Sequence, residues 1–146
     1  MTGNDILYLV IPCYNEEAVL HETAKQLLVK MNSMFARGMI SRESKIMFVN
    51  DGSRDRTWEI IKELHESNPI YSGVKLSRNK GHQNALLAGL MTAKEKADMA
   101  ISLDADLQDD VDVIDQMVEK YYEGNDVVYG VRSARDTDTF FKKFTA

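Results

Sequence analysis

The chain has 146 residues, 44% of them hydrophobic and 28% charged, and a formal net charge of −5 at pH 7. This length and composition suit one compact domain with a buried core and exclude a largely disordered chain. The acidic balance argues against a general nucleic-acid-binding protein, because such a protein needs a basic surface.

Short apolar runs of strand length alternate along the chain with longer stretches that place apolar residues at helical spacing. In chain order, these patterns predict a strand over 6–11, a helix over about 16–35, a strand over 45–49, a helix over about 55–67, a strand over 70–76, a helix over about 82–96, a strand over 99–103, a helix over about 113–121 and a strand over 127–131.

Strands that alternate with helices of this length predict right-handed crossovers and a mainly parallel sheet with helices on both faces. The predicted strands are apolar throughout, as expected where both faces of a sheet are covered. No repeat, linker or low-complexity segment interrupts the pattern. The predicted fold class is therefore a Rossmann-like α/β domain over residues 1–146.

The polar, non-periodic segments follow the predicted strands. They are residues 12–16, 50–53, 77–81, 104–108 and 130–132. In open α/β sheets, ligands bind beyond the carboxyl ends of the strands, so we expect these segments to line one edge of the sheet. Their coincidence at one edge, rather than any single loop, predicts a binding site.

The segment after the fourth strand is the most acidic of these. Asp104 and Asp106 are two residues apart in an extended stretch, so their carboxylates can face the same side. Together with the amide oxygen of Gln108 they suit a hard divalent cation. Helix capping is the alternative, and it suits the aspartates of 109–112 better than it suits Asp104 and Asp106.

The segment 50–53 has two interpretations. It is either a turn in which Ser53 or Asp55 caps the next helix, or a site where Asp51 accepts a hydrogen bond from a base and Gly52 permits close approach. The residues alone leave both open.

A helix start follows the third strand. Arg78, Lys80 and the amides near Gly81 would favour an anion there, and a solvated basic turn is the alternative. His82 is either a ligand or a polar residue on the first helical turn, and the second is favoured. Cys13 has no evident base partner and is interpreted as structural.

The polar segments and their flanking strands also resemble known motifs. The motifs are VIPCYNEE at 10–17, VNDGSRD at 49–55, LSRNKG at 76–81, LDADLQD at 103–109 and VVYGVR at 127–132. They resemble those of family-2 glycosyltransferases of GT-A fold, and the set looks like the polyprenyl-phosphate hexosyltransferase branch, which includes dolichol-phosphate mannose synthases and bactoprenol glucosyltransferases.

The resemblance implies a set of donor-binding residues. The residues implied to bind the nucleotide sugar are Pro12, Tyr14, Glu16, Asp51, Arg78, Lys80, Gly81 and Asp104. Within this set, Asp51 would lie near the base, and Asp104 near the ribose and the donor sugar. The donor would be a nucleoside-diphosphate sugar of the UDP-glucose or GDP-mannose type, with UDP-glucose favoured.

The resemblance also implies a metal ion and an acceptor. Asp106 and Gln108 would hold Mg2+ or Mn2+ with the diphosphate, and Arg132 and Lys143 would bind the phosphate of a polyprenyl acceptor. Asp104, Asp106 and Arg132 form the implied catalytic set. The implied reaction transfers a hexose to the polyprenyl phosphate with inversion at the anomeric carbon.

The chain departs from the family pattern in two motifs and in length. Asn50 stands where many relatives have aspartate, and Asp110 replaces a common proline. Relatives continue beyond this length, so we expect the N-terminal, donor-binding part of a longer enzyme with an incomplete acceptor side. The basic-aromatic segment 140–144 could begin an interfacial helix, and membrane contact is expected through the C-terminal region.

The expected location is the cytoplasmic side of a membrane. Cys13 is the single cysteine, which fits a reducing compartment. The N-terminus lacks a signal-peptide pattern, and no window approaches the ~20 apolar residues of a membrane span.

Other functions are less well supported. A phospho-accepting receiver module needs an acidic pair after its first strand, and a nucleotidyltransferase a glycine-rich loop there; neither is present. A family-2 enzyme of cell-surface polysaccharide synthesis with a saccharide acceptor, or a fragment that only binds nucleotide sugar, remains the alternative.

Overall fold

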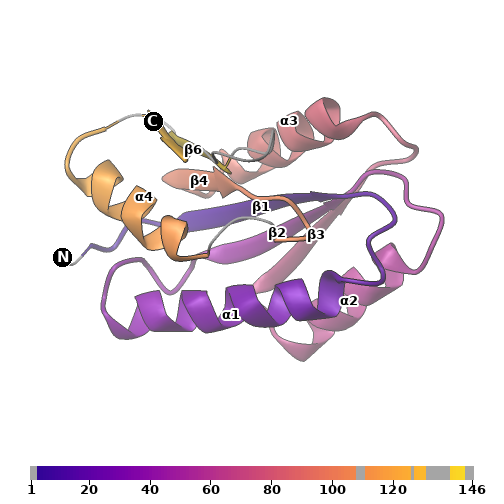
Figure 1. The fold of residues 1–146 in the computed structure, drawn as a ribbon, viewed down its shortest axis with the longest axis horizontal. Helices are drawn as coiled ribbons and strands as arrows, with labels where there is room; N and C mark the ends of the chain where they lie inside the picture. The colour runs from indigo at the N-terminus through magenta and orange to yellow at the C-terminus, as the bar shows by residue number, and fades with distance from the viewer. Residues whose placement is uncertain (1–2, 108–110, 126, 131–138, 144–146) are drawn as a thin grey trace.

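The computed structural model describes residues 3–107, 111–125, 127–130 and 139–143. Their elements, in chain order, are β1 (Leu7–Cys13), α1 (Leu20–Ala36), β2 (Lys45–Asn50), α2 (Thr57–Ser67), β3 (Tyr71–Lys75), α3 (His82–Ala93), β4 (Met99–Ser102), α4 (Asp112–Tyr122), β5 (Val127–Gly130) and β6 (Thr139–Lys143) (Figure 1). The predicted strands and helices are confirmed, and β6 is an additional strand. Within the described ranges, no helix is long and apolar enough to cross a membrane.

The strands form one sheet in the order β3-β2-β1-β4-β6-β5. The first four pair in parallel, whereas β6 runs antiparallel to both β4 and β5. The prediction of an interfacial helix beginning in 140–144 is therefore wrong for the described residues. Without β6, β4 would present an unpaired backbone edge on its side away from β1, and pairing with β6 satisfies that edge.

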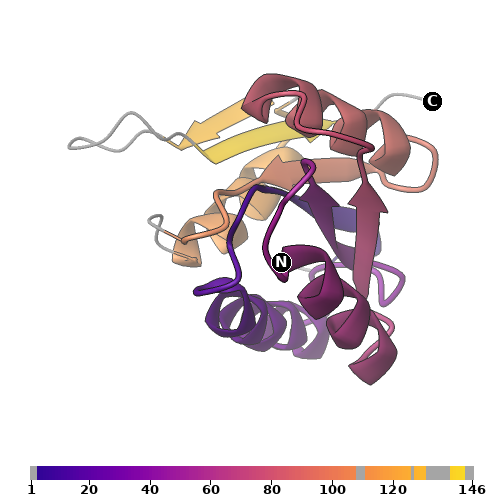
Figure 2. The same ribbon diagram turned by 90° about the vertical axis from the view of Figure 1, so that its right-hand side faces the viewer.

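Two apolar layers cover the sheet, as predicted. Side chains of β1 alternate between them: Leu7 and Leu9 join α1, α2 and α4, while Tyr8 and Val10 join α3. Figure 2 shows α3 on one side of the sheet and α1 and α2 on the other. This two-sided burial explains why the strands read as continuous apolar runs.

α3 packs very closely on the sheet. A Cβ atom at Gly89 would lie 2.6 Å from Cγ1 of Val10 and 2.7 Å from Cγ2 of Val49. The buried face of α3 is small throughout, with Ala85 and Ala93 on either side of this glycine. The close contact fixes the start of α3 beside the ends of β1 and β2, where the candidate site lies.

Candidate functional site

The parallel strands end together at one edge of the sheet. Cys13 pairs with Asn50 and Asn50 with Lys75, so β1, β2 and β3 finish in line. Ser102 of β4 pairs with Val10, and the amide of Leu103 then donates to the carbonyl of Val10 (3.1 Å). The prediction that the polar segments share one edge is confirmed for the described residues.

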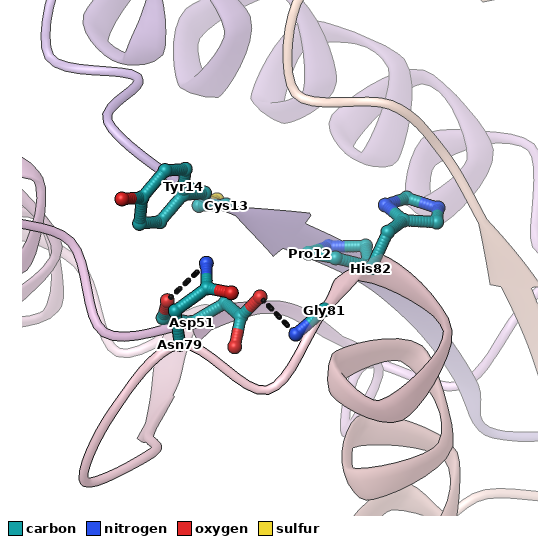
Figure 3. Close-up of a pocket in the computed structure, with 7 residues that line it drawn as sticks. All are labelled: Pro12, Cys13, Tyr14, Asp51, Asn79, Gly81 and His82. Atoms are coloured by element: carbon teal, nitrogen blue, oxygen red, sulfur yellow. Dashed lines mark hydrogen bonds between the residues drawn. The ribbon is translucent and has the colours of Figure 1, made fainter.

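A pocket of about 320 Å³ lies at this edge, between the ends of β1 and β2 and the start of α3 (Figure 3). Tyr14 stands at the end of β1 with 43% of its surface exposed, across from Asp51 and Asn79. The other lining residues are Pro12, Cys13, Gly81 and His82. The pocket thus joins an aromatic ring, a carboxylate and an amide, which are groups that contact nucleosides.

Asp51 forms the floor of the pocket and is only 3% exposed. Its carboxylate accepts hydrogen bonds from the amides of Lys80 (2.7 Å) and Gly81 (3.1 Å), and the side-chain amide of Asn79 donates to its carbonyl (3.3 Å). The anion expected at the start of α3 is therefore the carboxylate of Asp51 itself. The side chains of Arg78 and Lys80 are exposed.

Gly52 permits a close approach, although to the chain itself. Its φ is +68°, and a Cβ atom here would lie 2.3 Å from the amide nitrogen of Asn79 and 2.4 Å from the carbonyl carbon of Arg78. Any side chain would push the loop after β2 away from the segment before α3. Glycine at this position thus keeps the Asp51 carboxylate within reach of its amide partners.

The segment after β1 is tied to the loop between β2 and α2. The amide of Asn15, at φ +53°, donates to Oγ of Ser53 (3.0 Å), and the side-chain oxygen of Asn15 accepts from the amide of Arg54 (2.8 Å). The amide of Glu16 donates to Oγ1 of Thr57 (2.8 Å). These bonds hold 15–17 outside the helix, so α1 begins at Leu20 rather than near Glu16 as predicted.

Asp55 has a structural role at the start of the helix after β2, as one of the two interpretations of segment 50–53 predicted. Its carboxylate accepts hydrogen bonds from the amides of Thr57 (2.9 Å) and Glu17 (3.2 Å). Burial opposes ionisation of Asp55, but the hydrogen bonds from Thr57 and Glu17 outweigh it and hold the pKa of Asp55 below its ordinary value. Asp55 therefore orders the loop and the start of α2.

The acidic segment after β4 alternates between core and surface. Leu103 and Ala105 are buried, and Leu107 packs against the same apolar layer. Asp104 and Asp106 occupy the positions between them and are partly buried and exposed respectively.

The predicted extended stretch at Asp104 and Asp106 is wrong: β4 ends at Ser102, and the amide of Leu107 donates to the carbonyl of Asp104 (3.1 Å), which closes a turn over Ala105 and Asp106. One carboxylate oxygen of Asp104 is buried, so the side-chain alternation of a strand does not place the two carboxylates. Gln108 lies outside the described residues.

Glu16 brings a third carboxyl group toward these aspartates. Burial raises the pKa of Glu16, and the negative charges of Asp106, Asp104 and Asp55 raise it further. The structure thus gathers acidic groups from the β1 and β4 loops at one place.

The donor set at this place fits a divalent cation. Within the described ranges, no group of three or more His, Cys, Asp or Glu side chains forms a complete metal site. Mg2+ and Mn2+ do not need one, since with nucleotides they are held by one or two carboxylates and by phosphate oxygens. The acidic segment therefore fits a metal ion that arrives with a diphosphate.

Of the two residues predicted to bind the acceptor phosphate, the structure describes Lys143 but not Arg132. Arg132 lies outside the described residues, although Gly130 and Thr139 pair at the loop edge of the sheet. Lys143 pairs with Met99, the first residue of β4, so its backbone lies at the opposite, amino edge. The structure does not bring Lys143 to the site, because β6 runs antiparallel to β4 and carries its end away.

Sequence reasoning missed several residues of this edge. Asn79 lies inside a motif yet received no role, and it lines the pocket. His82 also lines it, although its position alone favoured a plain surface residue. Cys13 fits the structural interpretation: it is 1% exposed, and burial together with the charge of Glu16 raises the pKa of its thiol.

Comparison with known proteins gives matches over nearly the whole chain. The family model described as Glycosyl transferase family 2 matches residues 8–145. An uncharacterized glycosyltransferase of Bacillus subtilis, YkoT, is 51% identical over 141 residues, which is 97% of this chain and 42% of that protein. The bactoprenol glucosyl transferase of Shigella phage SfV is 38% identical over 141 residues, covering 94% of this chain and 42% of that protein.

The fold has a solved counterpart as well. The mannosyltransferase PcManGT from Pyrobaculum calidifontis, solved in complex with GDP-Man and Mn2+, is 20% identical and has a TM-score of 0.68. The match covers 92% of this chain and 38% of that one. The fold is accordingly that of the GT-A glycosyltransferases. The chain spans 42% of the length of the two relatives named above.

Proposed function

The chain belongs to glycosyl transferase family 2, and we propose that it is the donor-binding part of a metal-dependent, inverting hexosyltransferase. The donor is a nucleoside-diphosphate sugar and the acceptor a polyprenyl phosphate. The observation that carries the proposal is the meeting, at one sheet edge, of the Asp51 pocket and the acidic segment with Asp104 and Asp106. The first suits a nucleoside and the second a metal-bound diphosphate.

The pocket would hold the nucleoside. Tyr14 offers a half-exposed ring against which a base can pack, and Pro12 adds an apolar wall. Both Asp51 oxygens accept one backbone bond, and a carboxylate oxygen has a second lone pair that a base N–H can use. Glu16 and Asp104 would lie toward the ribose and the sugar.

The acidic segment would hold the metal ion and the diphosphate. Asp106, with Gln108, is the proposed ligand set, and the bound ion would neutralise charge on the departing diphosphate. The exposed side chains of Arg78 and Lys80 lie beside the pocket and would add positive charge toward the phosphates.

The acceptor is inferred from the relative. The Shigella phage protein is named a bactoprenol glucosyl transferase and shares 38% identity over 94% of this chain. A polyprenyl phosphate is ionised at neutral pH, so its oxygen can attack the anomeric carbon directly and invert it. Arg132 is the proposed phosphate contact, since a guanidinium binds phosphate in bidentate fashion. The whole protein would then work at a membrane.

The proposed donor is UDP-glucose, because the Shigella phage relative is named a glucosyl transferase. Calorimetry with UDP-glucose, GDP-mannose and UDP-N-acetylglucosamine, with and without Mn2+, tests this choice. Asp106→Asn should abolish the metal-dependent part of binding, while Asp112→Asn, which removes the same charge from α4, should not. Binding that is equal with and without Mn2+ would contradict the proposed metal dependence.

The acceptor needs a separate experiment. The full-length protein, supplied with labelled UDP-glucose and undecaprenyl phosphate, should produce a lipid-linked glucose with inverted anomeric configuration. Transfer to a saccharide acceptor with none to the lipid phosphate would instead indicate an enzyme of polysaccharide synthesis.

A further inference from the structure

Thr23 connects α1 to the acidic segment. It is 3% exposed, and its hydroxyl donates a hydrogen bond of 2.5 Å to the carbonyl of Ala105. The two residues are 82 positions apart in the chain, and Ala105 lies between Asp104 and Asp106. A buried side chain thus contacts the backbone at the centre of the acidic pair.

The Ala105 carbonyl is well placed to control both aspartates. It belongs to the peptide unit that joins Ala105 to Asp106, and Asp104 is attached on the other side. The peptide unit is planar, so fixing its oxygen also fixes the direction in which the chain enters Asp106. Ala105 is itself 4% exposed, so its buried side chain and the hydroxyl of Thr23 together fix the backbone from which the two carboxylates extend.

The segment also contains a turn that needs support. The amide of Leu107 donates to the carbonyl of Asp104 (3.1 Å), and Leu107 adopts φ +44°. A left-handed conformation is unfavourable for leucine and persists where surrounding contacts hold it. The Thr23 bond lies inside this turn and is such a contact.

We propose that Thr23 is a positioning residue, which orients Asp104 and Asp106 toward the metal-bound diphosphate of the donor. The inference rests on the proposed function, since it assigns Thr23 to the same site. Thr23 contacts neither donor nor metal and acts through the Ala105 carbonyl.

Tyr71 of β3 supplies a matched control, because its side chain bonds to the helix to which Thr23 belongs. Its hydroxyl donates to the carbonyl of Ala24 (2.8 Å), and it is 3% exposed. Tyr71→Phe therefore removes a buried hydroxyl-to-carbonyl bond next to Thr23 in α1 but leaves the acidic segment untouched. A general weakening of the packing of α1 would appear in both variants.

The test compares Thr23→Val, Thr23→Ser and Tyr71→Phe in two measurements. The first is amide hydrogen exchange of Leu107 without any ligand. Thr23→Val should speed this exchange about tenfold, the effect of losing one buried hydrogen bond, while Thr23→Ser and Tyr71→Phe should not. The second is calorimetric affinity for UDP-glucose with Mn2+, which should fall about tenfold in Thr23→Val alone.

The outcomes separate the inference from the proposed function. Equal results for Thr23→Val and Thr23→Ser, or an equal loss in Tyr71→Phe, would overturn the positioning role. If the wild-type chain binds no donor, the proposed function fails, and the exchange measurement still decides whether Thr23 orders the segment. Should Thr23→Val not fold, Thr23→Ala removes the hydroxyl with less crowding and takes its place in both measurements.

Discussion

The two halves of the candidate site are built in opposite ways. On the pocket side, the polar groups satisfy one another: the Asp51 carboxylate accepts backbone amides, and Asn15 and Ser53 join two loops. On the acidic side, Glu16, Asp104 and Asp106 bring like charges together, and burial together with these charges raises the pKa of Glu16. The pocket half is held by its own hydrogen bonds, whereas the acidic half would be stabilised by a bound cation.

This difference separates stability from binding. Groups that satisfy one another stabilise the fold before any ligand arrives, so changing them should cost folding free energy. Gathered like charges oppose the fold slightly, so neutralising one should cost binding and not stability. The predictions below test this division, from the largest expected effect to the smallest.

Asp51→Ala should destabilise the chain most, by about 3 kcal/mol. It removes the acceptor for two amides in a buried place, and hydrogen bonds to charged groups contribute about 1.5–3 kcal/mol each. Urea unfolding measures the loss. Asp51→Asn, which keeps one acceptor oxygen, should lose about half as much. A loss below about 0.5 kcal/mol for Asp51→Ala would show that the pocket half is not organised by this carboxylate.

Asp106→Asn should have the opposite effect, with a large loss of donor affinity and little loss of stability. We expect donor affinity in the presence of Mn2+ to fall about a hundredfold, or ~2.7 kcal/mol, because the ion loses a charged ligand. The free energy of unfolding without metal should stay within about 0.5 kcal/mol of wild type, since the side chain is exposed. A large loss of stability would mean that the side chain of Asp106 helps to hold the fold, as the groups of the pocket half do.

The local elements of this edge were predictable because their causes lie close in sequence. Apolar runs predicted the strands, and the polar segments that follow them predicted the edge at which the site lies. What sequence reasoning missed depends on distant partners. β6 forms because β4 offers an edge, and α1 starts late because Thr57 binds the amide of Glu16.

Thr23 and Lys143 show the same limit at single residues. Nothing near Thr23 in the sequence identifies a partner 82 residues away. Lys143 was assigned to the site by resemblance, and the antiparallel register of β6 carries its backbone to the other edge. Pairing register is set by the whole sheet, so neither outcome could be obtained from local pattern.

Gly52→Ala tests the geometry of the pocket half. It should destabilise the chain by about 2 kcal/mol, because a positive φ is strained for alanine and its Cβ would overlap the backbone of Asn79. Gly81→Ala is the matched control: φ is +93° there, but nothing lies within 4 Å of the added Cβ. Its cost should be only the strain, about 1 kcal/mol. Equal losses in urea unfolding would contradict the close approach.

The smallest expected effect concerns the ion pairs that dock α4, the helix after the acidic segment. Asp115 on α4 pairs with Lys30 on α1 (2.7 Å) and with Arg37, the residue just after α1. The side chain of Asp115 is 15% exposed. Burial opposes ionisation of Asp115, but the hydrogen bonds and charges of Lys30 and Arg37 outweigh it and lower its pKa. Asp115→Asn should therefore cost about 1 kcal/mol at neutral pH.

The stabilisation by Asp115 should depend on pH, in the direction that its lowered pKa sets. Because the pKa of Asp115 is lower in the folded chain, its stabilisation is fully present above the ordinary value of 3.8 and is lost as pH falls through the folded value. The difference in unfolding free energy between wild type and Asp115→Asn should stay constant from neutral pH to about 5 and shrink below about 4. Glu63→Gln, which breaks the exposed pair with Arg56, should show almost no difference at any pH, since both side chains are more than half exposed. A difference for Asp115→Asn that grows on acidification would mean that Asp115 is held by burial rather than by its cations.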